Sequence, residues 1–141
     1  MVHALNEIHR VLVTDGILID LRPLLDKWPI EIVSSGSQVY AGQATDLPEP
    51  LADDKSANAA MTDYEKLGWF HRESEEIFSL FYYWDTPKVM EVHITENWDD
   101  VIRIDETSWK TLRAAWAIAN ADARVRLRMK MVITRWGKCN L

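Results

Sequence analysis

The sequence is poor in cysteine. Its one cysteine, Cys139, lies near the C-terminus and has no partner for a disulfide within the chain. Small secreted folds that depend on disulfides are therefore excluded. The first residues also lack the basic and then apolar layout of a secretory signal. We expect a cytoplasmic protein, and we expect Cys139 to be a free, exposed thiol. It is not expected to act as a nucleophile, because no histidine or aspartate stands near it in the sequence.

Glycine-rich loops are lacking too. The five glycines are never closer than six residues apart. Nucleotide-binding loops need closely spaced glycines because backbone amides must approach the phosphate groups. Metal ligands are equally sparse: His71 with Glu73, and His93 with Glu96, offer two ligands each, whereas a zinc site needs three or four. We therefore expect this chain alone to bind no cofactor and no metal.

Long apolar runs are also missing. The longest uncharged apolar or aromatic run, at 77–84, is far shorter than the roughly 20 residues that a membrane-spanning helix needs. We expect no membrane span. With 48% hydrophobic residues and seven tryptophans, the chain can bury a hydrophobic core. Since no repeat or linker divides it, we expect residues 1–141 to form a single domain.

The N-terminal part of the chain shows a helix–turn–strand pattern. Apolar residues with helical spacing precede apolar residues that alternate as in a strand: Leu5, Ile8 and Leu12, then Ile17, Ile19 and Leu21. Gly16 is expected to supply the left-handed conformation that ends the helix. Pro23 is expected to end the strand, because proline lacks an amide donor.

The middle of the chain alternates between strand and helix patterns. Two short strands at 30–34 and 38–44 read as a hairpin, and Pro48 and Pro50 close this region. A helix is expected over 52–67, a buried strand over 77–84, and a helix over 87–98. A further helix follows 105–108, with three residues forming its buried stripe: Trp109, Leu112 and Trp116.

The C-terminal part has the clearest periodicity in the chain. From 124 to 134, odd positions are apolar, whereas even positions carry four cations and a threonine: Arg124, Arg126, Arg128, Lys130 and Thr134. A period of two predicts a strand with one apolar face on the core and one polar face. Together these elements predict an α+β fold, in which a small mixed or antiparallel sheet is combined with about four helices.

The N-terminal pattern resembles a late segment of class I S-adenosylmethionine-dependent methyltransferases. That segment, close to E-x-x-R-V-L-K-P-G-G, leads into the fifth strand of the family's sheet. Five residues match it: Glu7, Arg10, Val11, Leu12 and Gly16. Residues 13–15 differ, because Val, Thr and Asp replace the usual lysine, proline and first glycine. The order of elements also resembles the back half of the family fold, in which the seventh strand is antiparallel to its neighbours.

The resemblance implies a methyltransferase-like fragment or remnant. S-adenosylmethionine is implied by the family alone, because the family's cofactor loop lies well before this segment and only six residues precede Glu7. A separate chain would have to supply the front half. One alternative is a stand-alone domain that binds a small molecule or a protein. Another is that the chain start is artificial and the native protein is a complete enzyme. No residue is assigned as a catalytic base, and whether the chain is an enzyme stays open.

Two groups of residues are candidates for binding. The first group lies where the family's fold would cover the binding site of the methyl acceptor, and its residue types suit a small-molecule pocket: Trp69, His71 and Arg72. The alternative is that Trp69 joins the helix end to the core while His71 and Arg72 are solvated. The basic residues at 124–130 suit phosphates, but such residues are also common on the wet face of a strand, and the net charge of −6 argues against nucleic acid.

The resemblance further implies an open sheet edge. In the complete fold, the strand that follows Gly16 has neighbours on both sides, and one neighbour belongs to the missing front half. Unpaired amides beside apolar side chains favour pairing with another strand. We therefore expect a homodimer about a twofold axis. The alternative is a monomer in which the hairpin at 30–44 covers the edge.

Overall fold

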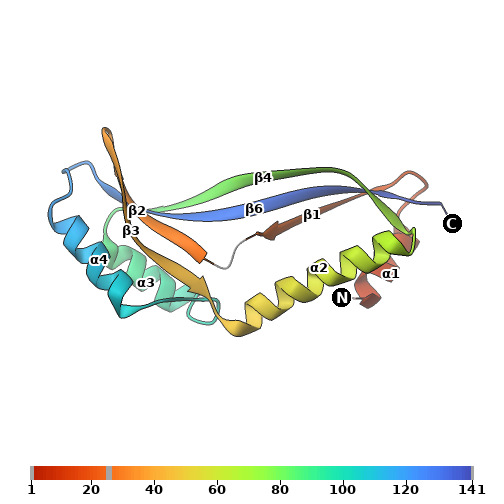
Figure 1. Ribbon diagram of the computed structural model, residues 1–141, viewed down its shortest axis with the longest axis horizontal. Helices are drawn as coiled ribbons and strands as arrows, with labels where there is room; N and C mark the ends of the chain where they lie inside the picture. Colours follow the sequence, from red (N-terminus) through yellow and green to blue (C-terminus); the bar gives the residue numbers. More distant parts are fainter. Residues whose placement is uncertain (1, 25–26, 141) are drawn as a thin grey trace. The chain divides into compact units, whose positions relative to one another are not determined.

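The computed structural model describes residues 2–24 and 27–140. Within these ranges the chain forms four helices and a six-stranded antiparallel sheet, which confirms the predicted α+β class (Figure 1). The elements in chain order are α1 (Val2–Val11), β1 (Ile17–Pro23), β2 (Lys27–Ser34), β3 (Ser37–Asp46), α2 (Pro48–Lys66), β4 (Phe70–Trp84), α3 (Pro87–Asn97), β5 (Ile102–Ile104), α4 (Glu106–Ala117) and β6 (Arg124–Lys138). None of the helices in the described part of the chain has the length and apolarity needed to cross a membrane.

The described residues fall into two compact units. Unit 1 contains those up to 24, those from 51 to 78 and those from 131 onward, and unit 2 contains those from 27 to 50 and from 79 to 130. The long strands β4 and β6 run through both units. The single domain that the sequence predicts therefore stays a prediction, to be tested by unfolding experiments.

In unit 1, helices α1 and α2 pack on β1 and the last part of β6. The core consists of Leu5, Ala60, Met61, Tyr64, Phe70 and Trp136. The predicted helix–turn–strand is confirmed, but its turn differs from the prediction. Asp15, with φ 59°, adopts the left-handed conformation instead of Gly16. Gly16 is needed because a Cβ there would lie 2.8 Å from the carbonyl oxygen of Val13.

In unit 2, the hairpin β2–β3 forms the centre of the sheet. β2 pairs with β6, and β3 pairs with β5. Helix α4 packs on β3 and β2, and α3 lies beside α4 (Figure 1). The predicted hairpin is thus confirmed, with a turn at Ser35 and Gly36. Pro48 and Pro50 do not merely close this region: they lie in the first turn of α2, where a missing amide donor costs nothing.

The strand predicted at 77–84 is present, but the prediction that it is buried is wrong. It belongs to the longer β4, in which Ile77, Phe81 and Tyr83 are 51%, 39% and 43% exposed. β4 pairs only with β6 among the described strands, so it is an edge strand with little cover. Aromatic content therefore indicated a strand correctly but did not indicate burial.

The predicted final strand is also present and extends to Lys138 as β6. Its odd positions are buried up to Met131, as predicted. Beyond that point the even positions Val132, Thr134 and Trp136 are buried, so Thr134 does not lie on a wet face. The reason is local: unit 2 packs its core on the odd side of β6, whereas the core of unit 1 contains Trp136.

Candidate functional site

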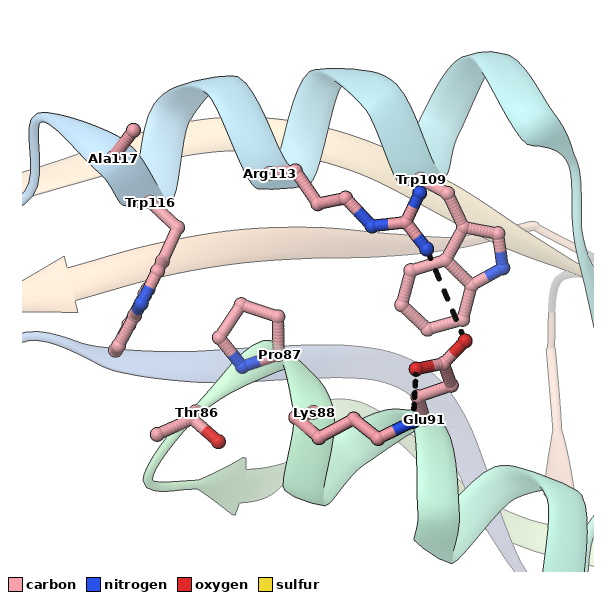
Figure 2. Close-up of a pocket in the computed structure, with 8 residues that line it drawn as sticks. All are labelled: Thr86, Pro87, Lys88, Glu91, Trp109, Arg113, Trp116 and Ala117. Carbon is pink, nitrogen blue, oxygen red and sulfur yellow. Dashed lines mark hydrogen bonds and ion pairs between the residues drawn. The ribbon is translucent and has the colours of Figure 1, made fainter.

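A cavity of unit 2 lies between the beginning of α3 and one face of α4. It has a volume of about 430 Å³. Its lining residues come from these two helices and the residue before α3, as Figure 2 shows: Thr86, Pro87, Lys88, Glu91, Trp109, Arg113, Trp116 and Ala117. Its volume lies in the range of small-molecule sites. We call it the α3–α4 cleft.

Capping residues fix where both helices begin. The Thr86 hydroxyl accepts a hydrogen bond from the amide of Val89 at 3.2 Å, and Pro87 occupies the first turn of α3. The carboxylate of Asp105 accepts from the amide of Ser108 at 2.6 Å at the start of α4. This hydrogen bond lowers the pKa of Asp105, because it favours the ionised carboxylate. A helix from 87 and another after 105–108 were predicted from the sequence, so the frame of the cleft follows from local signals.

The walls of the cleft are two tryptophans of α4. Trp109 and Trp116 stand two helical turns apart, and both indoles reach toward α3 with Pro87 between them in Figure 2. Leu112 is fully buried, whereas both tryptophans are only partly buried. The predicted buried stripe is therefore correct for Leu112 and wrong for the tryptophans, whose indoles line an open cavity.

Charged side chains lie around the mouth of the cleft. Glu91 accepts from Lys88 at 3.0 Å and pairs loosely with Arg113 at 3.8 Å. The guanidinium of Arg113 also lies over the Trp109 ring, 5.7 Å from its centroid. Two cations thus share one carboxylate beside the positive end of the α3 dipole. The cations at the mouth therefore favour the binding of an anionic group, and the indole walls favour the binding of a flat apolar ring.

The other end of α3 is held by an aromatic cluster. Trp98, the residue after α3, contacts Trp28, Tyr82 and His93, with ring centroids 6.4, 4.8 and 4.9 Å away. His93, one of the paired metal-ligand candidates, is thus engaged with aromatic rings. Among the residues that the structure describes, no group of three or more His, Cys, Asp or Glu side chains is placed to hold a metal ion.

The candidates Trp69, His71 and Arg72 lie in unit 1 and contact different neighbours. Trp69 packs against Tyr64 and His9, with ring centroids 5.3 and 4.6 Å away. Arg72 pairs with Glu75 at 3.2 Å and lies over the Trp136 ring. His71 faces Glu73, with 3.4 Å between Nε2 and Oε1. A shared binding role for these three residues stays a prediction.

The fold brings Cys139 and His71 together, although they are far apart in the sequence. The sulfur lies 3.5 Å from Nδ1 of His71. The backbone carbonyl of Cys139 lies 3.3 Å from Nε2 of His9. No sequence pattern predicts these contacts, because they depend on the pairing of β6 with its neighbours.

The chain has no match among known protein families, curated proteins or solved structures. Its function is therefore argued from its own residues.

Proposed function

We propose that this chain is a methyltransferase-like fragment or remnant, equivalent to the C-terminal half of a class I methyltransferase, without independent cofactor binding or catalysis. The proposal rests on the N-terminal motif together with one structural observation. β6 pairs antiparallel with β1, and it also pairs with β4. If β1, β4 and β6 are equivalent to the family's fifth, sixth and seventh strands, this is the pairing expected of the seventh strand. The single cysteine fits a reducing cytoplasm as the setting.

The proposal gives β1 the role of a docking strand. Among the described strands it pairs only with β6, so its other edge is open. Ile17, Ile19 and Leu21 on one face are 41%, 55% and 53% exposed. Asp20 and Arg22 do not shield these side chains, because they form a mostly buried ion pair with each other at 2.5 Å. Arg135 of β6, which pairs with Glu73, lies opposite Ile19, but the other edge of β1 is not covered by a described strand. An apolar strand with an open edge is suited to accept another strand.

Calorimetry with S-adenosylmethionine tests the statement about the cofactor. We expect no binding in the micromolar range, because the widely spaced glycines provide no cradle of amides for the ligand. Any measurable micromolar affinity of the isolated chain would contradict the proposal.

A second candidate function is favoured by the α3–α4 cleft. We propose that it binds a small aromatic carboxylate, with the ring between Trp109 and Trp116 and the carboxylate toward Arg113. Tryptophan faces bury large apolar area, and an arginine fork matches a carboxylate. This function is compatible with the first, since an acceptor-side region has to hold a small molecule.

Titration with indole-3-acetate tests the second function. Arg113→Gln and Trp116→Ala are each expected to weaken binding by about tenfold or more, which equals about 1.4 kcal/mol. The matched control is Arg103→Gln, which removes an equal charge from an exposed residue of β5 outside the cleft. Equal affinities of the Arg113→Gln variant and the control would exclude the cleft as the binding site.

A further inference from the structure

A second hollow of unit 2 is lined mainly by cations. It has a volume of about 170 Å³ and is formed by Lys27, Pro29, Ser79, Arg128 and Lys130. The residues come from three neighbouring strands, since β2 and β4 both pair with β6. We call it the cationic hollow.

Strand register explains why these side chains meet. Glu31 of β2 lies opposite Arg126 of β6, and side chains at every second position share a face. Lys27 and Pro29 therefore lie on the Glu31 side of β2, and Arg128 and Lys130 lie on the Arg126 side of β6. On β4, Phe81 lies under the guanidinium of Arg126, at 4.6 Å from its ring centroid, so Ser79 belongs to the same face.

The buried carboxylate that the structure describes on this face already has hydrogen-bond and ion-pair partners. Glu31 is 3% exposed and accepts from Arg126 at 2.7 Å and from Gln38 at 2.9 Å. Although burial opposes the charged form, hydrogen bonds to Tyr83 and Glu31 raise the pKa of Arg126 above its usual value. Arg128 reaches Glu31 only at 3.4 Å. The negative charge of Glu31 is thus neutralised chiefly by Arg126.

The cations at the hollow therefore exceed their acidic partners. Asp85 pairs with Arg124, at the far end of this basic face. Among the described residues, no carboxylate pairs with Lys27 or Lys130. Like charges that share a strand face are destabilising unless an anion lies between them. Two lysines without a described acidic partner, together with Arg128 and its longer contact to Glu31, thus leave an excess of positive charge at the hollow.

The cations of the hollow lie beyond the paired segment of β2 and β6. Lysine and arginine on an edge strand prevent unwanted pairing. However, β2 pairs with both β3 and β6, and β6 pairs with three of the described strands. Pairing of β2 with β6 ends at Ile30 and Leu127, and pairing of β6 with β1 begins at Met131, so the hollow lies where β2 and β6 separate. The cations discourage unwanted pairing there, and they also leave a space that a ligand can enter.

We propose that the cationic hollow binds the phosphate group of a small phosphomonoester. A hollow of this volume holds the phosphate group, while the rest of the ligand lies outside. The Arg128 guanidinium offers paired donors to two oxygens, the two lysines add charge, and the Ser79 hydroxyl adds a neutral donor. A doubly charged phosphate group has enough acceptor oxygens and enough negative charge to bind the arginine, the two lysines and the serine.

The test uses the full chain titrated with methyl phosphate and with inorganic phosphate, against potassium chloride at equal ionic strength. We expect saturable binding of both phosphates, with methyl phosphate at least as tight as inorganic phosphate. Lys27→Gln and Lys130→Gln are each expected to weaken it about fivefold or more, as for the loss of a charged hydrogen bond. Both lysines are exposed, so the fold is expected to survive these substitutions.

Lys110→Gln is the matched control, because Lys110 is an exposed lysine of α4 whose partner Glu106 lies 4.0 Å away. It is expected to bind methyl phosphate as the unaltered chain does. A response to phosphate no larger than that to chloride overturns the proposal, and so does an equal loss in the control. Binding of a short single-stranded oligonucleotide without saturable binding of methyl phosphate also overturns it, in favour of a nucleic-acid surface.

Discussion

Two exposed aspartates hold backbone amides at turns of unit 2. Asp105 accepts from Ser108 at 2.6 Å, and Asp122 accepts from Ser35 at 2.9 Å. Hydrogen bonding lowers the pKa of each carboxyl below its ordinary value of 3.8: for Asp105 from the amide and then the side chain of Ser108, and for Asp122 from the side chain and then the amide of Ser35. The stabilisation that they give is therefore fully present above pH 3.8 and is lost as the pH falls through the lowered pKa of the folded state.

We predict that Asp105→Ala destabilises the protein near neutral pH and that its difference from the unaltered chain shrinks below pH 3.8. The reason is that a protonated Asp105 is a weaker acceptor for the Ser108 amide, so the unaltered chain loses the same contact. Urea unfolding at several pH values measures the difference. Asp99→Ala serves as the control at an exposed acid, and a difference that stays constant with pH for Asp105→Ala would contradict the prediction.

At the scale of elements, the closest approach of the hairpin to α4 depends on a glycine. Gly42 has φ +125°, and a Cβ there would lie 2.8 Å from Cβ and 3.0 Å from Cα of Ser108. Ser108 is buried, and its hydroxyl accepts from the amide of Gln43 at 3.2 Å. Helix α4 therefore packs against β3 at a position where a side chain is missing.

Gly42→Ala is predicted to lower the free energy of unfolding by more than about 1 kcal/mol, because it adds both backbone strain and a clash with backbone atoms. Gly36→Ala is the control, since a Cβ at Gly36 meets nothing within 4 Å. Chemical denaturation of the two variants separates the effects. Similar stabilities of both variants would mean that the hairpin and α4 do not approach so closely.

The sequence predicts most elements of the fold because their signals are local. The caps at Thr86 and Asp105, the turn before Ser37 and the alternation along β6 all depend on residues near each other in the chain. The three-residue strand β5 was missed, because it is too short to show a period. Burial of β4 was predicted wrongly, because composition does not tell how many neighbours a strand has.

The candidate sites follow less well from the sequence, because they depend on tertiary placement. The period of α4 indicates that Trp109, Leu112 and Trp116 share one side, but a helix face is wider than the strip that fits into the core. Which of the three residues lines a cavity is decided by where α3 begins. For the cationic hollow, the sequence shows the cations of β6 but not that Lys27 lies beside them.

At the scale of the whole molecule, the open edge of β1 predicts self-association. We expect a homodimer with a mass near twice 16.3 kDa, formed by pairing of β1 with its copy about a twofold axis. Light scattering at micromolar concentration measures the mass. A value near 16.3 kDa for the unaltered chain would contradict the homodimer.

Substitution of β1 locates the contact. Ile19→Lys places a charge on the open face of β1 and is expected to shift the mass toward that of one chain. Val39→Lys is the matched control, because Val39 is a similarly exposed apolar residue, 47% exposed, on a different strand, β3. Equal dissociation by both variants would place the contact elsewhere.

The pairing of β6 has a consequence for how the chain folds during synthesis. β1 is synthesised long before its partner at Met131–Gly137, which lies more than 100 residues further along the chain. Residues 30–33 of β2 likewise pair with residues 124–127 of β6, which are synthesised much later. Until then, Ile17, Ile19 and the aromatic residues of β4 have no strand beside them, and unpaired apolar strands are prone to aggregate. The sheet can therefore be completed only after β6 has been synthesised, and a stall shortly before β6 would leave β1 and β4 without their partner strand.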